Sequence, residues 1–324
     1  MSSNGQKIDT TIRSKKVFLV SPEHISCRHP WIVWPKEPST DFIQQIKKFG
    51  QQTPVLVIKK NKRYHLVHGY KRVQAALQLN QPIWCLEIEP LPIKKLILLY
   101  VSLNAHQLNT PWAKIKALRI LTPFGWEKED LELLQINIKG PQQEYFQTWL
   151  RLPAYWDELL ENEHLCLESS TYLAKLKQPE LEYLFPFFKL LKWSKSNQHK
   201  LLTWLTELKL QQHIALEQLE QDLGLIAILK SNLSPQDKIK NILHTVWNKR
   251  FPTMAVKKTQ LDQHLKNISN GTLWHIEHKQ HLENTALFFQ AHLNGQKTLE
   301  QAITELRLIA KQNPWKIWHD LLTV

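Results

Sequence analysis

Short apolar runs alternate with amphipathic segments over the first ninety residues of the chain. The apolar and β-branched runs predict strands at 17–20, 53–58, 64–67 and 83–88. A Ser-Thr-Asp cap followed by periodic apolar positions and a closing Gly predicts a helix over 39–50, and a second helix is predicted over 70–79. The Pro-rich segment between 21 and 39 predicts irregular structure. This alternation is typical of a small mixed α/β domain.

Beyond Pro92 the apolar positions are spaced three and four residues apart, which predicts a long series of helices. One later strand is predicted, in TLWHIEHK at 272–279. A new capped helix starts near 231, so domain boundaries are expected near 91 and 231. The predicted parts are a flexible tail at 1–16, an α/β domain at 17–91, a helical domain at 92–230 and a mostly helical C-terminal domain at 231–324. The fold class is α+β.

The composition and the positive net charge of the chain indicate which class of partner it binds. Apolar residues make up 43 %, as in a globular protein, and 42 Lys and Arg against 29 Asp and Glu give a net charge of +13. Such a balance favours polyanions, nucleic acid first. The three Cys residues form no CxxC pair, which fits a reducing compartment. With no signal-like N-terminus and no apolar run longer than LILLYV, we expect a cytoplasmic protein with no membrane partner.

The stretch HGYKRVQAALQL at 68–79 carries the clearest chemical signal. Gly69 lies at a predicted strand-to-helix turn, where free backbone amides and the helix dipole attract anions, and Lys71 and Arg72 add two cations. From Gln44 to Leu86 the chain has no Asp or Glu, so the local field is cationic. The alternative is a plain turn before a surface helix with two exposed cations. Phosphate binding requires that the N-terminus of this helix be accessible and that Arg72 not form an ion pair with a carboxylate of the chain.

The order of these segments resembles the ParB/sulfiredoxin superfamily, specifically the N-terminal domain of ParB-like proteins. VSPEHI at 20–25 is similar to the family's opening strand, FGQQTPVLVI at 49–58 to its Gly-x-x-x-Pro segment, and HGYKRVQAALQL to its arginine box. Weaker similarity continues through 103–118 and 146–176. The resemblance implies a nucleotide, CTP or ATP, whose phosphates contact the box. The implied phosphate-binding residues are His68, Gly69, Tyr70, Lys71, Arg72, Thr53 and Asn104.

The box departs from the family pattern at the positions that bear on catalysis. Gly69 and Arg72 match, Lys71 replaces an Arg, and Tyr70 and Leu103 stand where the family has acidic residues. Because Mg²⁺ prefers oxygen ligands, these losses argue against bound Mg²⁺ and against hydrolysis. Sulfiredoxin's reactive Cys is also absent, and Cys85 lies in a predicted strand, where we expect it to be buried and inert. No catalytic residue is therefore assigned.

A DNA-binding element is expected between residues 127 and 152, because ParB proteins carry a helix-turn-helix after the nucleotide domain. The predicted helices are 127–134 and 141–150, with a turn longer than usual for this motif. The expected DNA contacts are Gln142, Gln143, Gln147, Thr148 and Arg151. The alternative is an ordinary pair of packed helices with solvated Gln side chains.

The remaining motifs leave three functions to compare. His275, His278 and His281 lack the ligand spacing of a zinc site, so no metal site is predicted. The leading hypothesis is a ParB-like DNA-binding protein for DNA partitioning or transcriptional regulation, with a nucleotide site at 68–72. The alternatives are an interaction scaffold that kept the fold but lost turnover, and a nucleotide-dependent enzyme such as a kinase or nuclease. The oligomeric state stays open, a homodimer included.

Overall fold

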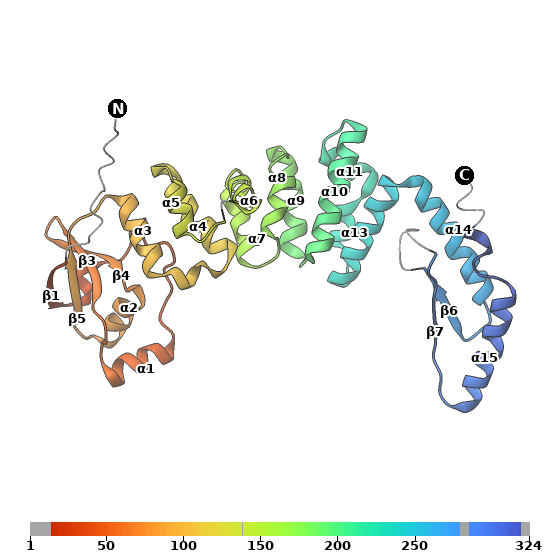
Figure 1. The fold of residues 1–324 in the computed structure, drawn as a ribbon, viewed down its shortest axis with the longest axis horizontal. Helices are drawn as coiled ribbons and strands as arrows, with labels where there is room; N and C mark the ends of the chain where they lie inside the picture. Colours follow the sequence, from red (N-terminus) through yellow and green to blue (C-terminus); the bar gives the residue numbers. More distant parts are fainter. Residues whose placement is uncertain (1–13, 138, 279–284, 319–324) are drawn as a thin grey trace. The chain divides into compact units, whose positions relative to one another are not determined.

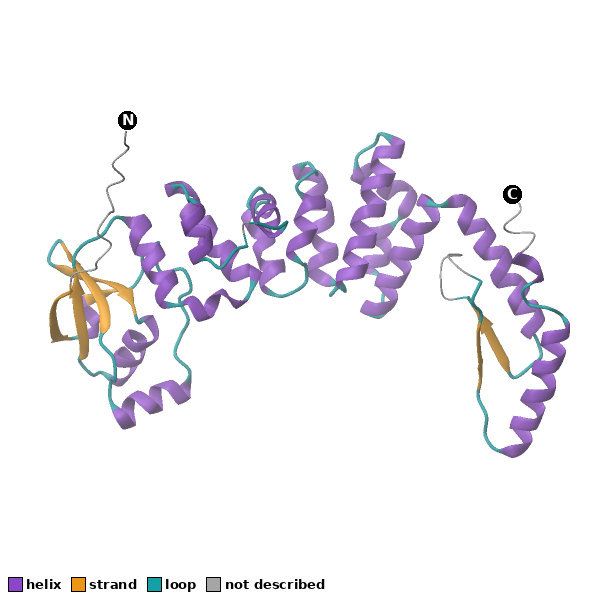
Figure 2. Ribbon diagram, viewed as in Figure 1, coloured by secondary structure: helices purple, strands orange, loops and turns teal. Residues whose placement is uncertain are grey.

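The computed structural model describes residues 14–137, 139–278 and 285–318 (Figure 1). The chain divides into two compact units, residues 1–176 and 177–324. The predicted α+β class is confirmed, since a five-stranded sheet near the N-terminus is followed by many helices (Figure 2). The domain boundaries near 91 and 231 remain a prediction.

The N-terminal sheet has the strand order β1-β5-β3-β4-β2. Its elements, with the two helices that belong to it, are β1 Ser14–Val20, β2 Ile25–Ser26, α1 Thr40–Phe49, β3 Val55–Lys60, β4 Arg63–His68, α2 Tyr70–Leu79 and β5 Ile83–Ile88. β3 and β4 form an antiparallel hairpin, and β5 returns through α2 to lie parallel to β3. Asn61 and Lys62 form the hairpin turn, and both have a positive φ. Positive φ at both central residues is what a tight two-residue hairpin turn requires.

The core of this sheet comes from the apolar runs that predicted its strands. Val55, Val57, Leu66 and Val67 are fully buried, and Val73 of α2 is buried with them. β2 was not predicted, because only two residues pair in parallel with β4 and a pairing that short has no periodic signal. It lies in the Pro-rich segment that was expected to be irregular.

The rest of the first unit is helical. Its elements are α3 Ile93–Leu103, η2 Ala105–Asn109, α4 Pro111–Leu121, α5 Lys128–Leu133, α6 Gln142–Trp149, α7 Asp157–Glu161 and α8 Ser170–Leu173. The Asp157 carboxylate joins three of these helices, since it accepts from Arg119 Nε at 2.5 Å and from Trp149 Nε1 at 2.8 Å. A charge-assisted pair reinforced by an indole donor fixes α4, α6 and α7 together.

The second unit is also mainly helical. Its elements are α9 Gln178–Leu190, α10 Lys195–Gln212, α11 Leu216–Leu223, α12 Leu225–Lys230, α13 Pro235–Arg250, α14 Pro252–Ser269, β6 Trp274–Glu277, β7 Phe288–Ala291 and α15 Gln296–Lys311. The strand predicted at 272–279 is β6, and its antiparallel partner β7 was missed. None of the helices in the described residues is long and apolar enough to cross a bilayer.

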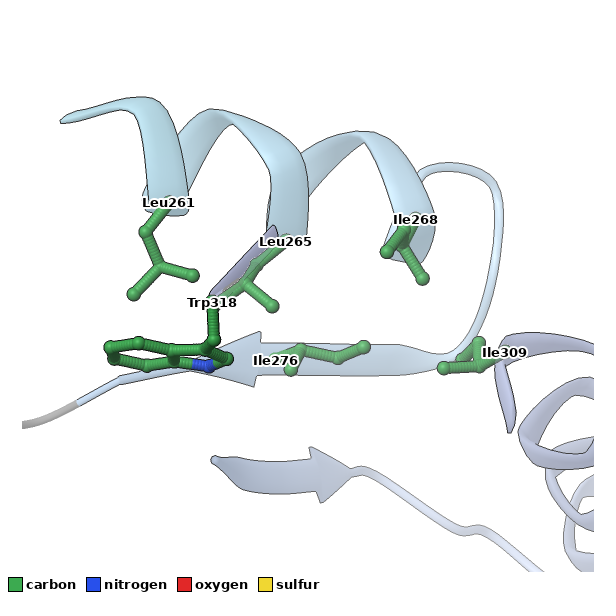
Figure 3. Packing of buried hydrophobic residues seen from close by; sticks show 6 residues of the cluster. All are labelled: Leu261, Leu265, Ile268, Ile276, Ile309 and Trp318. Atoms are coloured by element: carbon green, nitrogen blue, oxygen red, sulfur yellow. The ribbon is translucent and has the colours of Figure 1, made fainter. Parts of the chain in front are cut away.

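The hairpin of β6 and β7 and the helices beside it have a small core of their own. Leu261, Leu265 and Ile268 of α14 meet Ile276 of β6 and Trp318 (Figure 3). The α14 residues recur at intervals of three and four, so one stripe of the helix covers the strand. Burial of this stripe accounts for part of the apolar periodicity of the C-terminal sequence.

Candidate anion-binding site

Gly69 shapes the mouth of helix α2. Its φ of 106° lies in a region that side-chain-bearing residues rarely adopt, and a Cβ there would lie 2.7 Å from Val55 Cγ1. Within the described residues no side chain caps this end of the helix. The amide of Arg72 donates to Gly69 O at 2.9 Å. Those of Tyr70 and Lys71 come too early in the helix for an intrahelical acceptor, and the helix dipole adds partial positive charge. The local geometry is therefore that of an anion-binding turn.

A cavity of about 190 Å³ opens at this mouth. Its lining residues are Trp34, Lys36, Phe42, His68, Gly69, Tyr70, Lys71, Arg72, Tyr100, Asn104, His106 and Gln107. Three of these are cations and none is a carboxylate, so the cavity favours a negatively charged ligand. Six of the seven residues predicted for the phosphate site line this one cavity, and Thr53 does not. Whether they bind a phosphate remains a prediction.

Arg72 is held by the segment before β3. Its Nη1 donates to Thr53 O at 2.6 Å, to Thr53 Oγ1 at 2.5 Å and to Pro54 O at 2.9 Å. Burial lowers the pKa of the guanidinium, and among the described residues Arg72 forms no ion pair. Its charge is therefore not neutralised by a carboxylate, but one arm of the guanidinium anchors the fold. Thr53 belongs to the site as this anchor.

His68 is neutral near pH 7. Burial, followed by the charges of Arg72 and His106, lowers its pKa to about 4, against a smaller opposing effect of a side-chain hydrogen bond with Asn104. Its Nδ1 lies 3.4 Å from Arg72 Nη2, so Nδ1 is the acceptor and the ring proton is on Nε2. The Asn104 amide in turn donates to Tyr100 O at 2.7 Å. These neutral groups orient the cations without adding charge.

Tyr70 contacts an acid from elsewhere in the chain. Its hydroxyl donates to Glu37 Oε1 at 2.9 Å, and burial together with this bond raises the pKa of the phenol. Leu103 lies at the end of α3, 40 % exposed, and does not line the cavity. Trp34 and Lys36 could not be predicted from the sequence, because the Pro-rich segment that carries them has no periodic pattern.

Helices α5 and α6 occupy the predicted helix-turn-helix positions, but two of the five expected DNA contacts are engaged within the fold. Gln142 Oε1 accepts from Asn137 N at 2.8 Å, and Thr148 Oγ1 donates to Glu144 O at 2.7 Å and lies 2.9 Å from Ser170 Oγ. A base contact by the Thr148 hydroxyl would require its bonds to break, whereas the bond of Gln142 engages only its Oε1 atom. Three expected contacts remain accessible, namely the partly buried Gln143 and Gln147 and the exposed Arg151. DNA binding by these residues remains a prediction.

The His residues of 275–281 and Cys85 were the other candidates for metal and thiol chemistry. Within the described residues no group of three His, Cys, Asp or Glu side chains could hold a metal ion, and His281 lies outside those residues. His278 is buried beside the Trp318 ring, and His275 is exposed. Cys85 is fully buried, and burial raises the pKa of its thiol to about 12, which disfavours the reactive thiolate.

A larger open groove of about 690 Å³ runs along α14 and the end of α13. It is lined by Asn248, Ala255, Val256, Thr259, Gln260, Gln263, His264 and Asn267. These side chains include several amides but no Lys or Arg, so the groove lacks the cations that mark the smaller cavity at α2. The smaller cavity is therefore the better candidate for an anion site.

Comparisons with known proteins gave similarity to solved structures alone. No model of a known protein family matches the chain, and no curated protein matches it in sequence. The chain is similar to a Pnob8-like ParB-N domain, with 14 % identity and a TM-score of 0.35 over 60 % of this chain and 91 % of that one. It is also similar to the C-terminally truncated chromosome-partitioning protein ParB from Caulobacter crescentus in two complexes.

The Caulobacter protein complexed to the centromeric parS site matches with 12 % identity and a TM-score of 0.33, over 52 % of this chain and 90 % of that one. The same protein complexed with CTP-gamma-S matches with 15 % identity and a TM-score of 0.25, over 51 % and 95 %. TM-scores this low do not by themselves establish a common fold or function. The function is therefore inferred from the residues of the site.

Proposed function

We propose that the cavity at the N-terminus of α2 binds the phosphate end of a nucleotide, CTP or ATP, without hydrolysing it. The observation that carries this proposal is a lining with three cations and no carboxylate at the start of a helix. The cavity of about 190 Å³ is smaller than the roughly 300–1,000 Å³ typical of pockets that enclose drug-sized ligands. It suits a chain of phosphates with the nucleoside outside, and it offers no oxygen ligands for Mg²⁺ beyond neutral side chains and carbonyls.

Lys71→Ala is the sharpest test of the site, because Arg72→Ala would also remove the anchor on Thr53. We expect the affinity for CTP, ATP and inorganic triphosphate to fall about tenfold or more, since a charge-assisted hydrogen bond contributes roughly 1.5–3 kcal/mol. Isothermal titration calorimetry with and without Mg²⁺ measures this. Lys47→Ala is the matched control, because Lys47 is an exposed Lys of the same unit that does not line the cavity.

Three results of these titrations separate the candidate functions. Binding that is weakened by Lys71→Ala and unaffected by Lys47→Ala supports the proposal. If no nucleotide binds, the hypothesis of an interaction scaffold is supported instead. Tyr70 and Leu103, which stand where ParB-like proteins have acidic residues, favour that hypothesis. Release of phosphate during the titration would instead support the hypothesis of a nucleotide-dependent enzyme. It would refute the proposal that the nucleotide is bound without being hydrolysed.

We further propose that the protein is a ParB-like DNA-binding protein acting in DNA partitioning or transcriptional regulation. The net charge of +13 and the similarity of the sequence around 49–79 to ParB-like proteins support this. The exposed Arg151 after α6 is the best placed of the predicted DNA contacts.

Arg151→Ala is expected to weaken binding to duplex DNA and to reduce the slope of log affinity against log salt by about 0.9, one phosphate contact. Fluorescence anisotropy of a labelled duplex over a salt series measures both quantities. The control is Arg63→Ala, which removes an exposed Arg of the same unit at the start of β4. Equal effects of the two variants would mean that α6 has no special role.

A further inference from the structure

The segment from Trp34 to Pro38, here called the strap, contributes to the cavity from outside the box at 68–72. Trp34 and Lys36 both line the cavity, and they come from the Pro-rich segment between β2 and α1. Lys36 is the one lining cation that α2 does not supply. The strap therefore brings a second source of hydrogen-bond donors and charge to the same space.

Trp34 carries a buried donor without an acceptor. Its side chain is 8 % exposed, and its Nε1 has no hydrogen-bond partner within the described residues. Trp31, three residues earlier, donates its indole N–H to Leu66 O at 2.8 Å. The Trp34 nitrogen is enclosed by protein, so Trp34 lines the cavity through other atoms and its N–H is not open to a ligand there.

Two hydrogen bonds fasten the strap on either side of Lys36. The Tyr100 hydroxyl donates to Trp34 O at 3.2 Å, and the Tyr70 hydroxyl donates to Glu37 Oε1 at 2.9 Å. The Glu37 carboxylate is thus held by Tyr70 and does not line the cavity. The Lys36 side chain itself is exposed, and these two bonds hold the residues on either side of it next to the cavity.

We propose that the Lys36 ammonium donates to the phosphate oxygens of the ligand and so adds a cation from the strap to the donors of α2. Tyr70 is a positioning residue in this arrangement, since it holds the strap through Glu37. The inference rests on the proposed nucleotide-phosphate site and adds to it a residue from the strap, a second segment of the chain. It assigns a role to Tyr70 that needs no metal.

Inorganic triphosphate is the probe, because it contains the shared phosphate chemistry without a nucleoside. We expect Lys36→Gln to lower its affinity about tenfold, the size expected for one charged hydrogen bond, and Trp34→Phe to leave it unchanged, because the Trp34 N–H is enclosed. Trp34→Phe keeps an aromatic ring and removes the unpaired donor, so its denaturation midpoint without ligand should stay at or above that of the wild type. Calorimetry and urea unfolding of the full chain measure both quantities.

The matched controls are Lys47→Gln and Trp84→Phe, which alter an exposed Lys and an exposed Trp of the same unit outside the cavity. Tyr70→Phe should weaken triphosphate binding in the wild type but not in the Lys36→Gln background, because it acts through the strap. A wild type that does not bind triphosphate refutes the proposed function itself. Binding weakened by Lys71→Ala but unchanged in Lys36→Gln keeps that function and overturns the role proposed for Lys36.

Discussion

Replacing Gly69 by alanine is expected to destabilise the first unit by about 2–4 kcal/mol and to weaken triphosphate binding at least tenfold. The φ of 106° is strained for any residue with a Cβ, and the new Cβ would lie 2.7 Å from Val55 Cγ1 and 3.3 Å from Arg72 Nη2. Val55 is fully buried in the sheet, so it cannot move aside without disturbing the core. The first turn of α2 must shift, and with it the amides that face the cavity.

Gly50→Ala separates the backbone strain from the clash. Gly50 also has a positive φ, 71°, but a Cβ there would meet nothing within 4 Å. We expect it to cost about 1–2 kcal/mol and to leave triphosphate affinity unchanged. Urea unfolding and calorimetry of both variants make the comparison. If Gly69→Ala destabilises the unit no more than Gly50→Ala, close packing against Val55 is not what requires glycine at the helix mouth.

The strands and helices of the first ninety residues could be predicted because their signals are local. The runs at 53–58 and 83–88 became β3 and β5, and the Gly turn before 70–79 became the start of α2. β2 and β7 could not be predicted in the same way. Each is short, and its identity as a strand depends on a partner elsewhere, β4 for one and β6 for the other.

The candidate site shows the same division between local and distant causes. The box at 68–72 could be recognised because its Gly and cations are adjacent in sequence. The strap residues Trp34 and Lys36 could not, since they reach the cavity through tertiary contacts made by Tyr70 and Tyr100. The bonds of Arg72 to the 53–54 segment could not be predicted either. An Arg in a sequence motif gives no sign of whether its guanidinium contacts a ligand or a backbone carbonyl.

In the second unit, the largest effect is expected at Glu180, a buried carboxylate of α9. Its Oε2 accepts from Lys209 Nζ at 2.6 Å and from Lys177 N at 2.8 Å, and its Oε1 accepts from Leu216 N at 3.3 Å. It therefore ties the start of α9 to α10 and to the start of α11. Burial raises the pKa of Glu180, but these donors outweigh burial and the net pKa is lowered. Its contribution to stability is full at neutral pH and is lost as the pH falls through the folded pKa.

Glu180→Ala is expected to cost about 3–5 kcal/mol, because it leaves the partly buried Lys209 without its counter-ion and two helix-start amides without an acceptor. Hydrogen exchange should locate the loss of protection in 177–223 and leave the sheet of the first unit protected, because the loss arises within the second unit. Glu182→Ala, an exposed acid on the same helix, is the matched control and should cost less than about 0.5 kcal/mol. If both variants exchange alike, the Glu180 hydrogen bonds contribute no more to stability than a surface contact does. The three helices are then held by their apolar faces alone.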